Sequence, residues 1–334
     1  MKGWMAVLLI VAMVSAASGH VPLPGGGNDH LEHALAVDDP TKSWVVYDRL
    51  DAGGTAKYYR FEMNEGEELR LSVFTPEQSA FSPGMVVMGP GIAPSGMVPP
   101  FVEVPDSAGA AVVPGQAPEQ AEFEPFTPAA IYPGAAYSVI VPAAGIYYAA
   151  VFEPDEGGAF GLVVGFREEF STTEFLLVPV AVLGIHQWEG QPLAVILVPV
   201  ALTLIAGAGL LAIGLRREEI VLCCLFGWLA IGAALLYLGT AMMLLVQTAI
   251  ALEKTGADPA AVLPLVYVLV SAILGTFAIR TGIARNGRAS RRGGVFMVVI
   301  GLLGLLSWSG LLLGPVLALA AGVLGLVRPD GAAP

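Results

Sequence analysis

The feature that most limits the fold is a series of long apolar stretches in the second half of the chain. They cover residues 192–215, 221–249, 260–283 and 295–327. Each exceeds the roughly 18 to 20 residues that a helix needs to cross the hydrocarbon core of a bilayer. Because lipid cannot satisfy exposed backbone polar groups, such stretches cross it as helices. The sequence therefore predicts a four-helix transmembrane domain over residues 192–328, followed by a tail at 329–334.

The fourth stretch allows two interpretations. It has 33 residues, which is long for one span, and Ser-Trp-Ser-Gly together with Gly314-Pro315 favours a bend. A re-entrant pair of helices would return the C-terminus to the side on which the stretch begins, whereas one tilted helix would carry it across. We expect one helix, with the pair as the alternative.

Small residues recur at every fourth position of this stretch. They are Gly310, Gly314, Ala318 and Gly322. Such a stripe lets two helices approach closely, because it removes side-chain bulk from one face. It predicts helix packing, either inside the bundle or between copies in a homo-oligomer.

Charge divides the chain into two unlike parts. Residues 20–191 carry 23 acidic and 6 basic side chains, a net charge of −17, and residues 192–334 carry 5 acidic and 9 basic ones, a net charge of +4. The first part is expected to face water, and the second to be a membrane domain with basic loops. Nucleic-acid binding needs clustered Lys and Arg, so the acidic part argues against nucleic acid as a partner.

The N-terminus and the loops together predict the orientation. Residues 1–19 contain Lys2, an apolar core and small residues, a pattern typical of a secretory signal peptide cleaved after Ala17 or Gly19. An uncleaved anchor helix is the alternative. The loops 216–219 and 280–292 hold seven of the nine basic side chains of the membrane part, which favours the cytoplasm for both. We therefore expect a multi-pass protein of the cell membrane with an extracytoplasmic N-terminal domain.

The predicted spans lack the charges that ion-coupled transport needs. No Asp, Glu, Lys or His lies in the middle of any of them, and buried charges are the usual signature of pumps and coupled transporters. The sequence disfavours that class and leaves the lipid bilayer as the first predicted partner.

Residues 41–170 predict an antiparallel β-sandwich. Short runs rich in β-branched and aromatic residues alternate there with turn signals such as Asp-Ala-Gly-Gly. The spacing indicates about seven to nine strands, and no helical period of comparable strength appears before Ser171. Residues 20–40 are expected to be a flexible lead. The predicted fold class is α+β in separate domains, with an exported sandwich followed by an α-helical membrane bundle.

Two segments of this region carry a family resemblance. The motifs are Lys-Tyr-Tyr-Arg-Phe-Glu-Met with a Gly-Glu turn after it, and Gly-Ile-Tyr-Tyr with a closing Ala-Phe-Gly-Leu strand. Over residues 44–166 the chain resembles the pre-peptidase C-terminal (PPC) type of β-sandwich. The resemblance implies an auxiliary binding or stabilising module, with calcium in some members and rarely with catalysis. The Asp-rich strand that members often carry is replaced here by Ser-Pro-Gly-Met-Val-Val-Met-Gly. The whole arrangement also resembles archaeal cell-surface proteins with an exported sandwich on a four-helix anchor.

Two groups of residues are candidates for metal ligands. The imidazole candidates, suited to Cu(II) or Ni(II), are His20, His30 and His33. The carboxylate candidates, suited to Ca²⁺ at a hairpin turn, are Glu153, Asp155 and Glu156. A solvated lead and an exposed acidic turn are the simpler explanations. The sequence therefore predicts no cofactor, with copper or calcium as the alternatives.

The residues of nucleophilic catalysis are missing from the predicted sandwich. Between Asp38 and Phe170 there is no His and no Cys, so neither a Ser-His-Asp nor a Cys-His site can form within it. Cys223 and Cys224, the two cysteines of the chain, are adjacent and lie in an apolar stretch of the membrane part. We expect no enzyme activity, and a carboxylate-based hydrolase is the remaining enzymatic alternative.

A short segment at residues 171–191 joins the two predicted domains. Ser171-Thr-Thr-Glu174 has the capping-box pattern and predicts the start of a juxtamembrane helix. Trp188 is the residue type expected at the membrane interface, and Pro192 suits the first turn of the next helix. The candidate polar cluster consists of His186, Trp188, Glu189 and Gln191. It predicts a small polar pocket or, more simply, a hinge whose polar groups face water.

These observations favour a non-catalytic, membrane-anchored protein that binds or organises an unknown protein or other ligand at the cell surface. One alternative is an accessory or sensor subunit of a membrane complex that acts through its transmembrane bundle. The other is a metal-dependent surface protein that uses copper or calcium.

Overall fold

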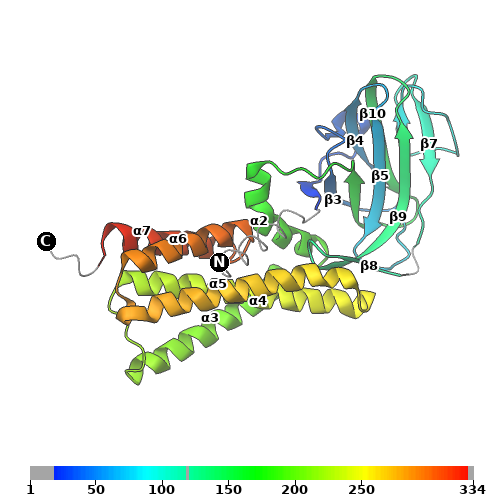
Figure 1. The fold of residues 1–334 in the computed structure, drawn as a ribbon. Coiled ribbons are helices and arrows are strands. Elements are labelled where there is room, and N and C mark those ends of the chain that lie inside the picture. The colour runs from blue at the N-terminus through cyan, green and yellow to red at the C-terminus, as the bar shows by residue number, and fades with distance from the viewer. Residues whose placement is uncertain (1–18, 118–119, 330–334) are drawn as a thin grey trace.

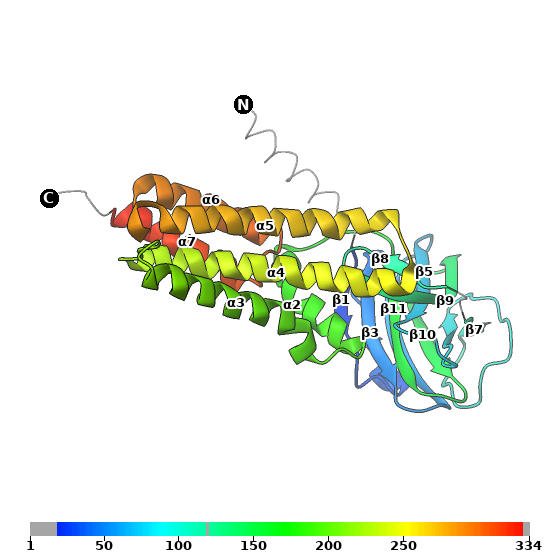
Figure 2. The ribbon, with the colours of Figure 1, turned by 90° about the horizontal axis from the view of Figure 1, so that it is seen from below.

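The computed structural model describes residues 19–117 and 120–329. In this part of the chain, a β domain of eleven strands is followed by six α-helices, α2 to α7 (Figure 1). The β domain lies at one end of an elongated bundle, and the long helices extend away from it (Figures 1 and 2). A β domain followed by an apolar helical bundle is thus the arrangement that the sequence predicted. The signal peptide predicted at residues 1–19 lies, except for Gly19, outside the described residues.

Two sheets form the β domain. The first has the strand order β1-β3-β11-β5-β9-β8, and the second has the order β2-β4-β10-β6-β7. The strands of the first sheet are β1 (Val21–Pro24), β3 (Trp44–Leu50), β5 (Glu68–Thr75), β8 (Glu122–Glu124), β9 (Ala129–Ile140) and β11 (Gly158–Val164). Those of the second are β2 (Leu35–Ala36), β4 (Thr55–Met63), β6 (Gly84–Gly89), β7 (Gly109–Val113) and β10 (Gly145–Glu153).

Alternate residues of the strands fill the space between the sheets. In β4 the buried inward side chains are Tyr59, Phe61 and Met63. Arg60 and Glu62 between them are exposed, which is the period-two pattern of a strand with one solvated face. The second sheet is also covered on its outer face, where Val102 of a long loop packs. Strand β6 is therefore buried on both faces, which explains its continuous apolar run.

Residues 20–40, predicted as a flexible lead, instead supply two further strands. Strand β1 pairs in parallel with β3, and β2 pairs in parallel with β4. Val21 and Val37 are buried in the sandwich core, at 2% and 3% exposure. Because these apolar side chains are buried, the lead forms one edge strand of each sheet. The strand count is therefore above the predicted seven to nine.

The helices begin directly after the β domain. They are α2 (Thr172–Trp188), α3 (Leu193–Arg216), α4 (Leu225–Thr255), α5 (Val262–Ile283), α6 (Arg291–Leu306) and α7 (Leu313–Val327). Among the described residues, three apolar helices are long enough to cross a membrane: Leu193–Arg216, Leu225–Thr255 and Pro259–Gly287. Helix α4 is central to the bundle and packs against α3, α5 and α7. These helices indicate a membrane protein in contact with a lipid bilayer.

The stretch 295–327, expected as one helix, is instead a helical hairpin. Helices α6 and α7 have 16 and 15 residues and pack against each other. The chain turns between them at Ser307–Leu312, where Trp308, Gly310, Leu311 and Leu312 have φ between +51° and +79°. Such irregular backbone is tolerated at membrane depth where protein surrounds it. The described part of the bundle thus has three long helices and a shorter pair, α6 and α7. The turn of this hairpin points toward the β domain (Figure 1).

The predicted small-residue stripe lies inside the bundle. Gly310 is in the turn, and the other members are on α7. Ala318 is fully buried, and a Cβ atom on Gly322 would lie 2.6 Å from the Val298 side chain of α6. The stripe thus allows α6 and α7 to approach, and its face is filled by the same chain. A homo-oligomer, which the sequence left open, stays a prediction.

Candidate functional site at the domain junction

Helix α2 connects the β domain to the bundle, and its start is fixed by the capping box that the sequence predicted. The Glu174 backbone N–H donates to Ser171 Oγ at 3.2 Å, and the Ser171 N–H donates to Glu174 Oε2 at 2.6 Å. Lys42 Nζ lies 2.8 Å from both carboxylate oxygens of Glu174. The first turn of the helix is therefore bonded to its own cap and to the loop before β3.

The end of α2 is attached to the sandwich by Trp188. Its indole N–H donates to the Asp48 carbonyl of β3 at 2.9 Å. Its ring lies edge-on to Tyr47 and Phe74, with centroid distances of 5.0 and 5.8 Å. The sequence suggested a membrane-interface role for Trp188, whereas the structure uses it to dock the helix on the β domain.

The predicted polar cluster is extended by a residue from α4. His186, at 1% exposure, has its Nδ1 2.9 Å from Glu189 Oε2. Gln191 and Gln247 exchange two amide hydrogen bonds, of 3.0 and 2.9 Å. Buried polar groups of this kind are stable only when paired. The cluster therefore bonds the end of α2 to the bundle rather than to water.

Gln247 was absent from the sequence-based candidates. It interrupts the apolar run Met-Met-Leu-Leu-Val-Gln-Thr-Ala-Ile, and a polar side chain within a membrane helix is a signal of interhelical bonding. Its amide carries no charge, so the charge pattern of the spans does not reveal it.

The hairpin turn makes a second connection between bundle and β domain. The Trp308 indole N–H donates to the Phe175 carbonyl of α2 at 2.8 Å. Its ring also lies 5.3 Å from that of Phe126, in the loop between β8 and β9, and 5.7 Å from that of Tyr267. The turn is held from the bundle side by Thr240 Oγ1, which accepts from the Gly310 N–H at 2.9 Å. The β domain therefore rests on α2 and on the hairpin turn together.

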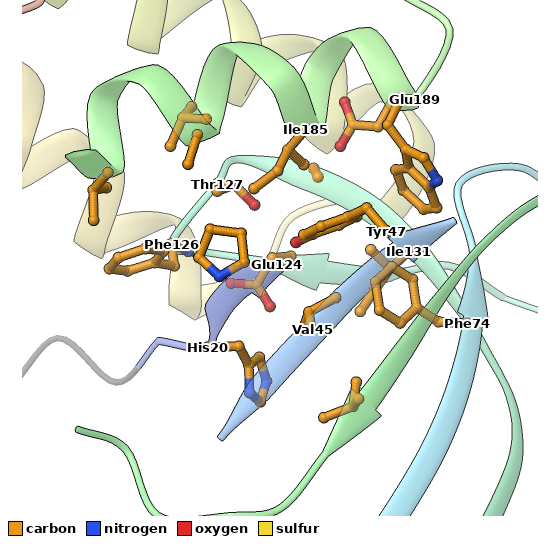
Figure 3. Close-up of a pocket in the computed structure, with 17 residues that line it drawn as sticks. His20, Val45, Tyr47, Phe74, Glu124, Phe126, Thr127, Ile131, Ile185 and Glu189 are labelled. Atoms are coloured by element: carbon orange, nitrogen blue, oxygen red, sulfur yellow. Dashed lines mark hydrogen bonds between the residues drawn. The ribbon is translucent and has the colours of Figure 1, made fainter. Parts of the chain in front are cut away.

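A cavity of about 60 Å³ lies between the underside of the sandwich and α2. We call it the junction cavity. Its polar side chains are His20, Tyr47, Glu124, Thr127 and Glu189. Figure 3 shows Glu124 below the Tyr47 ring and Glu189 above it, with Ile185 of α2 forming part of the apolar wall. Aromatic rings of Phe74, Phe126 and Trp188 complete the lining.

The junction cavity is acidic and poorly solvated. Burial raises the pKa of the Glu124 carboxyl, Glu168 raises it further, and the N–H groups of Phe126 and Thr127 oppose this shift. Burial also lowers the pKa of His20, which favours its neutral form. Among the described residues that line the cavity, none is Lys or Arg. Glu124 thus faces aromatic rings without a Lys or Arg partner from the lining, whereas the Glu189 carboxylate is paired with His186 Nδ1 at 2.9 Å.

A smaller space of about 50 Å³ adjoins the hairpin turn. It lies between the β8–β9 loop, α2, α4 and α5, and its lining includes Thr240, Tyr267 and Ser307. The Tyr267 hydroxyl is buried and has no hydrogen-bond partner within the part of the chain that the structure describes. This space lies beside the contact between Trp308 of the turn and Phe126 of the β domain.

The candidate metal ligands are not brought together. His20 Nδ1 bonds Ser43 Oγ, His30 Nδ1 lies 2.9 Å from Glu103 Oε1, and His33 Nδ1 lies 3.7 Å from Glu32 Oε1. Glu153 Oε2 accepts from the N–H groups of Asp155 and Glu156, so it stabilises its own turn. Within the described residues, no group of three or more His, Cys, Asp or Glu side chains has an arrangement that fits a metal ion.

No protein-family model matches the chain, and no curated protein shows significant similarity to it.

Proposed function

We propose that the protein is a non-catalytic, membrane-anchored binding protein of the cell surface, with its ligand site in the junction cavity. The observation that carries this proposal is a partly open, acidic, aromatic-lined cavity at the point where the β domain meets α2. An auxiliary binding module of PPC type, which the sequence resembles, is consistent with a sandwich in this role. The candidate site lies under the sandwich rather than on its exposed turns.

The chemistry of the cavity favours a small monovalent cation. Glu124 and Glu189 supply negative charge, while Tyr47 and Trp188 supply aromatic faces that attract cations. A cavity needs roughly 10 to 15 Å³ to hold one water molecule, so 60 Å³ admits an alkali ion with water or a methylated ammonium ion. A bound cation would offset the unfavourable burial of the Glu124 carboxylate.

Thermal unfolding of the full-length protein in detergent micelles tests this site. Chloride salts of sodium, potassium, ammonium, methylammonium and tetramethylammonium are compared at one ionic strength. The cation that binds should stabilise the protein by about 1.4 kcal/mol at ten times its dissociation constant. Glu124→Gln should abolish this effect, whereas Glu122→Gln, at an exposed position of the same strand, should preserve it. Equal curves in all salts, or equal effects in both variants, would rule out the site.

We further propose that the β domain is extracytoplasmic and that the Arg-rich loop 280–292 is cytoplasmic. The signal-like N-terminus and the charge bias of the loops support this orientation. Cys223 and Cys224 precede α4 at the end of the bundle that carries this loop, and Cys223 bonds Asn286 within it. A membrane-impermeant maleimide should therefore label the two cysteines in opened cells but not in intact ones. Labelling in intact cells would reverse the orientation.

The double connection at the junction favours a second candidate, a sensor subunit of a membrane complex. Trp188 bonds α2 to the β domain, and Trp308 bonds the hairpin turn to α2. The Gln191–Gln247 pair joins the segment after α2 to α4. Ligand occupancy would then alter a bundle that contacts a partner. Crosslinking in native membranes, followed by purification, should recover an integral membrane partner if this candidate holds. Recovery of surface ligands alone would favour the simple binding protein.

A further inference from the structure

The two cysteines of the chain form a pair at the start of α4. Cys224 is the N-cap residue of this helix, and its Sγ lies 3.1 Å from Sγ of Cys223. The Cys223 side chain is exposed. The start of α4 lies at the end of the bundle away from the β domain (Figure 1), and neither cysteine lines the junction cavity.

The neighbouring loop activates this pair. The backbone N–H and the Sγ of Cys223 both lie 3.1 Å from the Asn286 carbonyl oxygen. A hydrogen bond from Cys224 and the positive charge of Arg288 lower the pKa of the Cys223 thiol. A thiolate is the reactive form of cysteine, and an exposed cysteine beside a cation is the usual setting of a reactive thiol.

We propose that Cys223 and Cys224 are a redox-active dithiol that closes into a disulfide between adjacent residues, with Arg288 favouring the attacking form of Cys223. The oxidant is a small disulfide such as glutathione disulfide. Cys223 thiolate attacks one of its sulfurs and expels the first thiolate, which leaves a mixed disulfide. Cys224 then loses its proton and attacks Cys223 Sγ, which expels the second thiolate. Two cysteine thiols are thus oxidised, one external disulfide is reduced to two thiols, and two protons are passed to solvent or to the leaving thiolates.

The adjacency of the two residues makes this disulfide easy to reverse. Consecutive Cα atoms across a trans peptide are about 3.8 Å apart, whereas disulfides usually join Cα atoms roughly 4.4 to 6.8 Å apart. A strained disulfide is more readily reduced, which is typical of regulatory bonds rather than structural ones. Closure also removes the Cys223 thiol that donates to the Asn286 carbonyl. The hydrogen bond between this thiol and the loop that joins α5 to α6 therefore changes with redox state.

Thiol counting on the full-length protein in nanodiscs tests the proposal directly, because the chain has only two cysteines. The protein is equilibrated in buffers of reduced and oxidised glutathione, quenched, labelled with maleimide and weighed intact. We expect two labels to fall to none in one step, with loss of two hydrogens and no attached glutathione. Accumulation of a glutathione adduct, loss of one label alone, or a disulfide-linked dimer on a non-reducing gel would overturn it.

Two variants test the separate roles of Cys224 and Arg288, and a third is the control. Cys224→Ser should stop at a stable glutathione adduct, because no resolving thiol remains. Arg288→Gln should slow closure at pH 7 by at least about twofold, since it reduces the thiolate fraction of Cys223. Arg292→Gln, an exposed change in the first turn of α6, is the matched control and should close at the wild-type rate. Equal rates in both arginine variants, or no adduct on Cys224→Ser, would contradict the proposed step.

Discussion

Glu124 is a residue whose burial disfavours the charged carboxylate that the proposed cation site needs. It lies on the short strand β8 and faces a cavity that also contains Tyr47, Glu189 and His20. The sequence contains many acidic residues, and nothing local distinguishes Glu124 from the exposed Glu122 two positions earlier. Its environment is created by α2, more than 45 residues later in the chain, so sequence reasoning could not select it.

The pH dependence of stability follows from the raised pKa of Glu124. A carboxyl with a higher pKa in the folded state binds more protons there, so its contribution to stability falls as pH rises above the ordinary value of 4.5. In cation-free buffer, Glu124→Gln should therefore stabilise the protein at pH 7, and the gain should shrink as pH falls toward 4.5. Thermal unfolding of the two proteins against pH measures this difference. A destabilised variant at pH 7 would contradict the assignment.

The Gln191–Gln247 pair gives a second prediction at this scale. Gln247→Leu leaves the amide of Gln191 without its partner and should cost about 1–3 kcal/mol of unfolding free energy. Gln187→Leu, at an exposed position of α2, should have little effect. The double variant Gln191→Leu/Gln247→Leu should recover much of the loss, because both partners are then apolar. Denaturant unfolding checks all three, and additive losses in the double variant would show that the pair is not coupled.

At the scale of elements, local patterns predicted most of the fold. Strands such as β4, β6 and β10 carry period-two or continuous apolar runs bounded by turns, and α2 begins at a recognisable capping box. The break after α6 was visible in Ser-Trp-Ser-Gly, yet its outcome depends on packing of α7 against α6 and α4. Strands β1 and β2 were missed because each is short and gains stability only from the partner strand in the completed sheet.

The helical hairpin predicts a difference between two alanines of α7. Ala318 is fully buried in the bundle, whereas Ala320 is exposed. Ala318→Leu should destabilise the full-length protein by about 1–3 kcal/mol through overpacking, and Ala320→Leu should be close to neutral. Unfolding followed by the helical circular-dichroism signal measures both. Equal effects would show that α7 does not pack in the hairpin as described.

At the scale of the whole molecule, the β domain and the bundle are joined at several separate points. The contacts Trp188–Asp48 and Trp308–Phe175 link residues 140 and 133 positions apart. The sequence indicated a hinge between two domains because its local signals, a polar segment and a proline, do not contain such pairings. The docking of α2 on the β domain forms the cavity, and with it the proposed ligand site.

Hydrogen exchange of the full-length protein with and without the stabilising cation tests directly whether that cation binds in the junction cavity. Binding in the junction cavity should slow exchange on both of its walls, in residues 122–128 of the β domain and 178–189 of α2. Glu124→Gln should remove this protection, and Glu122→Gln should retain it. We expect protection of both walls in the wild type and in Glu122→Gln, but not in Glu124→Gln. Protection confined to exposed acidic turns such as 153–156, or no change at either wall, would contradict it.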